Sequence, residues 1–572
     1  MPVVDVVLKR LERLVPGKKA AEIIEALPFI ALDIEGIDEQ NKIARIEYNP
    51  NRPDFSSDYG IARALKGLLG IEKGIPSFKL AGKSNCKILV DPSIRSTRQY
   101  IVGLVAKNGN LDDETIRQLI AMQEDLHNGI GRRRRKASIG IHNLDAISFP
   151  VTYKAVGSEF SFIPLGSSIR QTIEQILESE IGKRYRYILG TEGRYPVIID
   201  RNNTVLSFPP IINGNATKID TSCKNIFVEV TATDLKTAED MLAIIAVTLY
   251  DAGFDIQTLS ISNVGQQKSQ DRNSKKPLPK GDARPSLTTT VPRMQQKVMI
   301  IDVKQVNSML GLRLSASQVA SCLEKSRLGA KVAKKDTIRC IIPRYRIDIM
   351  HPVDLVEEVA IGFGVYNLEP TLPAAAAVGH RSQLSVHMDI IRSTMIGAGF
   401  LESLSSGLSG RKVQYELAER KTPEEDKALA VHSPKSVEHE VLRESLIPSL
   451  MQSLSGNVHE EYPQKLFEIG KVFKKKDVIH EYYSVGAVVA HAEADYTEAK
   501  SVLQALMELC FGKSVTTVPA KDPTFIEGRT AQIIIDDSII GVIGEVSPSV
   551  VENFKLRMPV SAFEINLSLL FP

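Results

Sequence analysis

The sequence has no tryptophan and only five cysteines among 572 residues. The cysteines are scattered without Cys-x-x-Cys spacing, which argues against a zinc site and a disulfide framework and favours a reducing compartment. Charges appear by Lys9 and Arg10, before a signal-type apolar core could form, and no apolar run approaches the roughly 18 residues of a membrane span. We therefore expect a cytoplasmic protein with no membrane segment.

The sequence also lacks a large excess of either charge, because 71 Lys and Arg residues oppose 68 Asp and Glu residues for a net charge of +3. A protein that coats nucleic acid non-specifically would carry a large positive excess, so any contact with nucleic acid must be local. The sequence has no glycine-rich phosphate-binding loop, no Gly-x-Ser-x-Gly elbow and no His-Glu-x-x-His motif. The sequence therefore lacks the usual signatures of several enzyme classes.

The length suggests about four domains at roughly 150 residues each. From Gly265 to Pro285 almost no residue is apolar, so this stretch cannot join a core and marks the clearest boundary. We expect a multidomain α+β protein. Its predicted parts are an α+β domain (1–80), a longer α+β domain (81–265), a linker (266–290), a compact module (291–370) and helices alternating with antiparallel strands (371–572).

Four acids lie close together near a predicted helix start. Pro352 fits the first turn of a helix, which places Asp354, Glu357 and Glu358 at i, i+3 and i+4 on one face, with Asp348 on the preceding strand. Like charges at these spacings repel by a few tenths of a kcal/mol, and a hard divalent cation, preferably Mg²⁺, would reverse that cost. The alternative is that the acids only complement the helix dipole.

Small polar residues concentrate between Leu206 and Thr231. Glu229 and Thr231 differ by two positions, so both side chains face the same side of a predicted strand. A carboxylate and a hydroxyl on one wall could orient a water molecule against an ester. A plain surface strand with alternating polar residues explains the pattern equally well.

Five consecutive cations precede the strand-like residues 137–141. A phosphate backbone is a natural partner for such a run, although a solvated loop has the same composition. The candidates for RNA binding are Arg132, Arg133, Arg134, Arg135 and Lys136.

A set of ordered motifs, spread over about 420 residues, resembles one family along nearly the whole chain. The motifs include Asn51-Arg52-Pro53-Asp54, Ser207-Phe208-Pro209-Pro210, Tyr345-Arg346-Ile347-Asp348, Leu442-Arg443-Glu444-Ser445-Leu446 and Leu466-Phe467-Glu468-Ile469-Gly470. They are similar to those of the β subunit of phenylalanyl-tRNA synthetase, in its archaeal or eukaryotic cytoplasmic form.

The resemblance implies an α₂β₂ enzyme that joins phenylalanine to tRNA(Phe) using ATP. The α subunit would bind ATP and phenylalanine, so this chain would hold no catalytic residue for aminoacylation. Residues 371–572 would form a class II synthetase-like antiparallel sheet flanked by helices, without an active site. The 291–370 module would be winged-helix-like, and the family's Mg²⁺ ligands fall on Asp348, Asp354, Glu357 and Glu358.

The resemblance also implies that residues 81–265 are an editing domain, which hydrolyses tRNA(Phe) mischarged with tyrosine. An apolar pocket rejects an added hydroxyl only by about 10²-fold, so a second site must recognise that group. The resemblance places this pocket on Val197, Ser207, Glu229 and Thr231, with Glu229 bonding the tyrosine hydroxyl. Two other hypotheses are a structural RNA-binding subunit whose pocket has decayed and a magnesium-dependent phosphotransferase.

Overall fold

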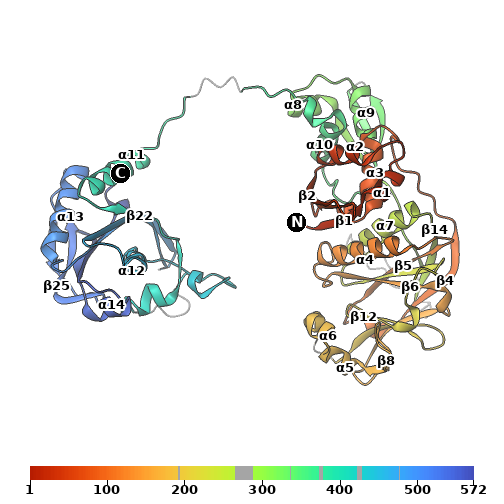
Figure 1. Cartoon of the computed structure of the whole chain (residues 1–572), viewed down its shortest axis with the longest axis horizontal. Helices are drawn as coiled ribbons and strands as arrows, with labels where there is room; N and C mark the ends of the chain where they lie inside the picture. Colours follow the sequence, from red (N-terminus) through yellow and green to blue (C-terminus); the bar gives the residue numbers. More distant parts are fainter. Residues whose placement is uncertain are drawn as a thin grey trace, which may run out of the picture. The chain divides into compact units, whose positions relative to one another are not determined.

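The computed structural model describes residues 1–190, 193–264, 288–334, 336–372, 378–421, 428–475 and 477–571. Two compact units, Met1–Leu372 and Pro373–Pro572, divide the chain and are treated separately (Figure 1). Both units mix helices and sheets, so the expectation of a multidomain α+β protein is confirmed. No helix among the described residues is long and apolar enough to cross a membrane.

The first unit begins with a small antiparallel sheet covered by helices. Its strands have the order β1-β3-β2, and Ser57 caps α3 by accepting a hydrogen bond from the Gly60 amide. Gly60 lies so close to the Asp54 carbonyl oxygen that a Cβ would stand 1.6 Å from it, which explains glycine after the Asn51-Arg52-Pro53-Asp54 turn. The elements are β1 (Val3–Val7), α1 (Leu8–Leu14), α2 (Ala20–Ala26), β2 (Leu32–Asp38), β3 (Ile43–Tyr48) and α3 (Asp58–Leu68).

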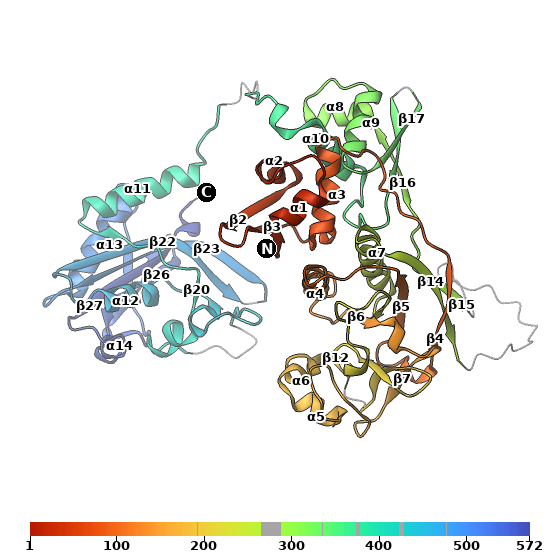
Figure 2. The same cartoon turned by 45° about the vertical axis from the view of Figure 1, so that its right-hand side comes forward.

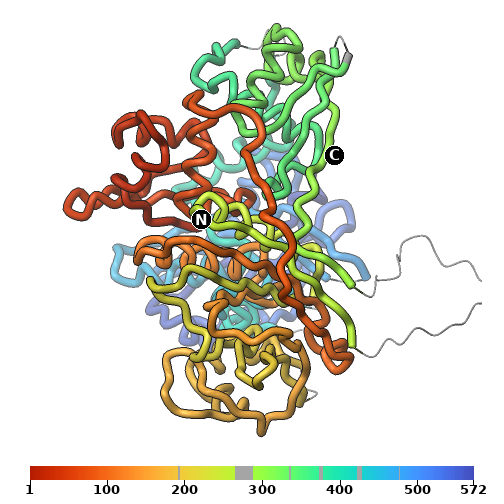
Figure 3. Tube along the Cα trace, turned by 90° about the vertical axis from the view of Figure 1, so that its right-hand side faces the viewer, coloured from red at the N-terminus to blue at the C-terminus, as the bar shows by residue number. Residues whose placement is uncertain are grey.

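The second domain of the first unit, from β4 to β15, is built on a ten-stranded sheet. Its strand order is β12-β11-β10-β7-β4-β14-β5-β13-β6, with β15 added to β14. An extended segment leads from α3 to β4 (Figure 3). The strands are β4 (Lys83–Val90), β5 (Tyr100–Lys107), β6 (Ala137–Asn143), β7 (Val151–Val156), β10 (Tyr195–Ile199), β11 (Val205–Phe208), β12 (Ile212–Asn213), β13 (Ile226–Ala232), β14 (Asp255–Asn263) and β15 (Thr288–Val291).

Helices α4 (Asp113–Asn128) and α7 (Leu235–Asp251) pack against the strands of this sheet, whereas α5 (Ile173–Glu178) and α6 (Glu180–Tyr185) lie at the other end of the domain (Figures 1 and 2). Asp234 caps α7, as its position before the helical spacing predicts. Residues 266–287 of the predicted linker lie outside the described residues. The predicted end at 290 differs from the structure, because the β-branched Thr288–Val291 pairs with β14.

The third domain packs three helices on the sheet β16-β18-β17. Ser315 and Gln318 form a capping box at the start of α9. Pro352 occupies the first turn of α10, as the sequence predicts. The elements are β16 (Lys297–Asp302), α8 (Val303–Leu310), α9 (Ala316–Lys325), β17 (Gly329–Lys334), β18 (Thr337–Ile342) and α10 (Pro352–Phe363).

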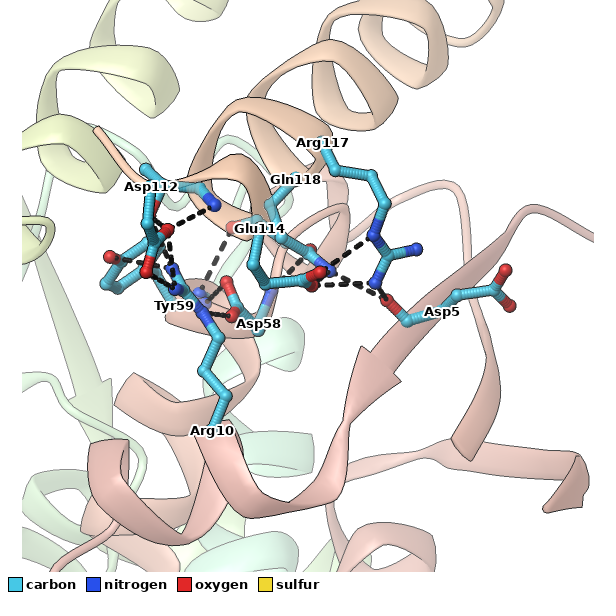
Figure 4. A network of polar contacts seen from close by, with 11 residues as sticks. Asp5, Arg10, Asp58, Tyr59, Asp112, Glu114, Arg117 and Gln118 are labelled. Carbon is cyan, nitrogen blue, oxygen red and sulfur yellow. Dashed lines mark hydrogen bonds and ion pairs between the residues drawn. The ribbon is translucent and has the colours of Figure 1, made fainter. Parts of the chain in front are cut away.

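One polar network joins the first two domains (Figure 4). Arg10 on α1 donates to the Tyr59 hydroxyl (2.9 Å) and to the Asp58 carboxylate on α3. The same guanidinium donates to Thr115 Oγ1 (3.0 Å) and Asp112 Oδ1 (3.3 Å) at the start of α4. Arg10 therefore fixes α4 to the N-terminal domain.

The second unit is built on a seven-stranded sheet, β19-β22-β23-β27-β26-β25-β24, in which only the β19-β22 pair is parallel. Helices α11 and α13 contribute to one apolar core and α12 and α14 to another. The elements are α11 (Gln383–Gly397), β19 (Leu401–Glu402), α12 (Ile447–Gly456), β22 (Gln464–Lys475), β23 (Ile479–Ala490), α13 (Tyr496–Phe511), β24 (Thr516–Pro519), β25 (Phe525–Ile535), β26 (Ser538–Val546), α14 (Pro548–Asn553) and β27 (Val560–Asn566).

Candidate functional site

A cavity of about 510 Å³ lies in the second domain, lined by α4, β6, β11 and α6 together with the segment that follows β11. Most of its wall is apolar. Isoleucines come from several of these elements, namely Ile116, Ile120, Ile139, Ile141, Ile181 and Ile211. A mostly apolar cavity with a few polar groups is typical of a small-ligand site.

Glu229 on β13 supplies the carboxylate of this cavity and is only 1% exposed. Its Oε2 has no hydrogen-bond partner among the described residues, and its Oε1 lies 3.9 Å from His142 Nε2, which also lacks one. The other ring nitrogen, His142 Nδ1, is 2.9 Å from Thr217 Oγ1. Gly140 leaves room for this pair, because a Cβ there would stand 2.3 Å from Glu229 Oε1.

Leaving a buried polar group unpaired costs about 1–3 kcal/mol, so the unpartnered Glu229 Oε2 and His142 Nε2, on neighbouring side chains, need an explanation. A ligand hydroxyl placed between them would satisfy both. It would donate to the carboxylate of Glu229 and lie within reach of His142. The arrangement is therefore suited to recognising a hydroxyl on an otherwise apolar ligand.

The structure brings together some of the predicted pocket residues and separates others. Ser207 lines the cavity, and its hydroxyl donates to Asn213 Oδ1 at 3.2 Å. Val197 and Thr231 do not line the cavity. Val197 is fully buried in a small apolar core beneath β10.

Thr231 contacts buried polar side chains instead of the cavity. Its Oγ1 accepts a hydrogen bond from Arg98 Nε at 3.1 Å and lies 3.0 Å from Ser138 Oγ. Thr231 shares a face of β13 with Glu229, as predicted. Its hydroxyl, however, contacts Arg98 and not the cavity. The alternative of a surface strand is wrong, because every residue of β13 is buried between β5 and β6.

His127 is a further polar group in the cavity wall that the sequence did not indicate. His127 Nε2 accepts from the Ile139 amide (2.8 Å), so its Nδ1 carries the proton and donates to Glu124 Oε1 (3.2 Å). Burial lowers the pKa of His127. Burial alone would raise the pKa of Glu124, but hydrogen bonds and positive charge from His127 and Arg134 lower it to about 2.

The basic run divides into residues with different roles. Arg134 lines the cavity, donating to Glu124 (2.7 Å) and to the carbonyl oxygens of Pro210 and Ile211 (both 3.1 Å). Lys136 lies 3.6 Å from Asp234. The other three side chains are exposed, namely Arg132, Arg133 and Arg135. A uniformly solvated loop is therefore not what the structure shows.

Two of the four acids of the third domain pair with an arginine. Arg346 donates to both carboxylate oxygens of Asp348 (2.9 and 2.7 Å) and to Glu358. Burial would raise the pKa of Asp348, but the Arg346 charge lowers it. Asp354 caps α10, accepting hydrogen bonds from two backbone amides before it at 2.8 and 2.7 Å.

Glu357 is exposed, and its pKa is raised by partial burial and by its carboxylate neighbours. Within the described residues, no group of three or more His, Cys, Asp or Glu side chains is placed to hold a metal ion. Three of the four acids already have a charged or backbone partner. The four acids are not gathered into one ligand set in this structure, and the predicted Mg²⁺ at these residues stays a prediction.

Comparisons with known proteins place the chain in a family. Residues 299–365 match the tRNA synthetase B5 domain, and residues 368–567 match the phenylalanyl tRNA synthetase beta chain CLM domain. The phenylalanine–tRNA ligase beta subunit of Archaeoglobus fulgidus is 39% identical, over 100% of this chain and 99% of that protein. The chain belongs to the phenylalanine–tRNA ligase beta subunit family.

This assignment confirms the resemblance seen in the sequence motifs and makes the chain an aminoacyl-tRNA synthetase subunit. The beta subunit of Methanococcus aeolicus is 35% identical over 99% of this chain and 100% of its own length. An N-terminal fragment of the phenylalanyl-tRNA synthetase β-subunit from Pyrococcus horikoshii is structurally similar. It has a TM-score of 0.58 and 29% identity, and the match covers 63% of this chain and 99% of the fragment.

Proposed function

We propose that the chain is the β half of an α₂β₂ enzyme that attaches phenylalanine to tRNA(Phe) with ATP, and that its cavity hydrolyses Tyr-tRNA(Phe). Family membership supports the first part. The observation that carries the second part is the buried Glu229 in the wall of an apolar cavity, with one carboxylate oxygen unpartnered and the other 3.9 Å from the unpartnered His142 Nε2.

The pair accounts for discrimination between tyrosine and phenylalanine. The tyrosine ring packs against the isoleucine walls, and its hydroxyl donates to Glu229 beside His142. Phenylalanine fills the same space but leaves both polar atoms unpaired. Sites built to bond a hydroxyl reject the analogue without it by about 10⁴- to 10⁵-fold, which apolar contact alone does not achieve.

The reaction is hydrolysis of the ester between the amino acid and the terminal ribose. A water oxygen attacks the carbonyl carbon, the bond to the ribose oxygen breaks, and that oxygen takes up a proton. Ser207 and Asn213 offer a hydroxyl and an amide oxygen to hold the water, since both line the cavity. Thr231 and Val197 support the domain rather than contact the substrate.

In this proposal the second unit serves assembly. Its antiparallel sheet with helices on both faces would be a class II synthetase-like domain without an aminoacylation site, and the 291–370 module would be winged-helix-like. The chain alone would make no Phe-tRNA, whereas co-expression with an α chain would restore synthesis. Full charging by this chain alone would refute the division of labour.

The editing test is deacylation of Tyr-tRNA(Phe) by the αβ complex carrying Glu229→Gln. The amide keeps the shape but removes the charged acceptor, so we expect hydrolysis to slow by at least tenfold. Glu174→Gln is the matched control, because Glu174 is an exposed acid on α5 of the same domain. Equal rates in the wild type and both variants would favour a structural RNA-binding subunit with a decayed pocket.

A further inference from the structure

The turn between α4 and β6 has a strained backbone. Arg132, Arg133 and Arg134 have φ values of 52°, 52° and 64°, a left-handed conformation that residues other than glycine rarely adopt consecutively. Such strain persists where the surrounding structure enforces it, often at functional sites. Here it directs Arg134 into the cavity wall and leaves its neighbours exposed.

Arginines of this turn stack on tyrosines at the end of α6 and just beyond it. Arg134 lies 4.3 Å from the ring centre of Tyr185 and Arg135 lies 5.0 Å from that of Tyr187. Arg184 of α6 lies 5.6 Å from the Tyr185 ring. The side chain of Tyr187 is 50% exposed. Cations and aromatic rings therefore alternate on one surface.

The basic-aromatic patch consists of Arg132, Arg133, Arg135, Arg184 and Tyr187. Its four guanidinium groups are exposed, and none has an ion pair with an acid in the part of the chain that the structure describes. Nearby Arg186 differs, because it pairs with Glu178 at 3.0 Å. The patch therefore carries uncompensated positive charge next to an exposed ring.

The patch borders the cavity. Arg134, which lines the cavity, lies between the patch residues Arg133 and Arg135 in the chain, and Ile181, which also lines it, lies three residues before Arg184 on α6. Exposed Ile120, 50% accessible, also belongs to the lining, so the cavity opens to the surface. A ligand that enters the cavity from solvent can therefore extend over the patch.

We propose that the basic-aromatic patch binds the single-stranded 3′ end of the RNA whose terminal ester enters the cavity. The inference rests on the proposed editing function. Arg132, Arg133 and Arg184 would contact backbone phosphates, to which the planar guanidinium is suited. A base would stack on Tyr187 beside Arg135, as unpaired bases do on aromatic side chains. An acidic protein segment would match the charge but not the ester cavity.

The test measures the affinity of the αβ complex for uncharged tRNA(Phe), intact and lacking its last four nucleotides. Removing those nucleotides should weaken wild-type binding by about tenfold, the effect of one or two lost stacks and phosphate contacts. In Arg132→Gln/Arg184→Gln, which removes two of the proposed phosphate contacts, and in Tyr187→Ala the same truncation should matter less than threefold. The double variant should also flatten the dependence of log affinity on log salt by about 1.4, since each single-strand phosphate contact contributes about 0.7.

Arg313→Gln is the matched control, because Arg313 is an exposed arginine between α8 and α9. It should behave as the wild type. An equal effect of truncation in the wild type and the patch variants would overturn the inference, as would loss of the α chain from the variants, which would make the patch a protein interface. Because the readout is binding, it is separate from hydrolysis. Glu229→Gln should lose Tyr-tRNA hydrolysis and keep the full effect of truncation.

Discussion

At the scale of single residues, Glu229 and Thr231 share one face of β13 but have different surroundings. Glu229 faces the cavity, whereas Thr231 accepts a hydrogen bond from buried Arg98. Thr231→Val should destabilise the chain by about 1–3 kcal/mol, because the guanidinium loses a buried acceptor. Hydrolysis of Tyr-tRNA per folded molecule should stay within about twofold of the wild type.

Urea unfolding and a deacylation assay at low temperature measure the two effects. Thr290→Val, an exposed threonine on β15, is the control and should change neither. A large loss of hydrolysis without a loss of stability would indicate that Thr231 contributes to the pocket, as the sequence predicts.

We expect the stability of the protein to depend on pH through the carboxylate of Glu124. Its folded pKa of about 2 lies below the ordinary value of 4.5, so its contribution to stability is complete above pH 4.5 and is lost as the pH falls towards 2. In Glu124→Gln this part of the loss should be absent. Melting temperatures measured from pH 5 to pH 2 test the difference. Parallel curves for the two proteins would contradict the role of His127 and Arg134 in holding this charge.

At the scale of elements, α10 and the preceding turn depend on Arg346. Arg346→Met should cost about 3–5 kcal/mol, because it leaves the acids Asp348 and Glu358 buried without a counter-charge. The triple variant with Asp348→Asn and Glu358→Gln should recover most of that loss. Removal of Mg²⁺ by a chelator should leave the wild-type melting temperature unchanged. A rise in melting temperature on addition of Mg²⁺ that disappears in Glu357→Gln would support the magnesium prediction instead.

Features of the elements that depend on near neighbours in sequence were predictable. Asp234 caps α7 and Ser315 pairs with Gln318, since each contact spans two or three residues. The burial of Glu229 was not predictable, because β5 and β6 flank β13 from distant parts of the chain. The inward direction of Arg134 was not predictable for a related reason, since three left-handed residues in a row turn one cation of the run inward.

At the scale of the whole molecule, the N-terminal domain is coupled to the cavity through α4. Arg10 holds the start of α4 (Figure 4). Ile116 and Ile120 of the same helix line the cavity. Arg10→Met should destabilise the first unit by about 3–5 kcal/mol, because Asp58 is fully buried and would lose its partner. Limited proteolysis and urea unfolding measure this, and adding Asp58→Asn should restore much of the stability. No rescue by the second change would contradict the pairing.

The central claim is that the cavity selects tyrosine by its hydroxyl. The most direct test is the ratio of kcat/KM for hydrolysis of Tyr-tRNA(Phe) to that of Phe-tRNA(Phe) by the wild-type αβ complex. The unpaired Glu229 and His142 predict a ratio of at least about 10³, since a hydroxyl-bonding site strongly rejects the analogue without it. A ratio near 1 would contradict the account.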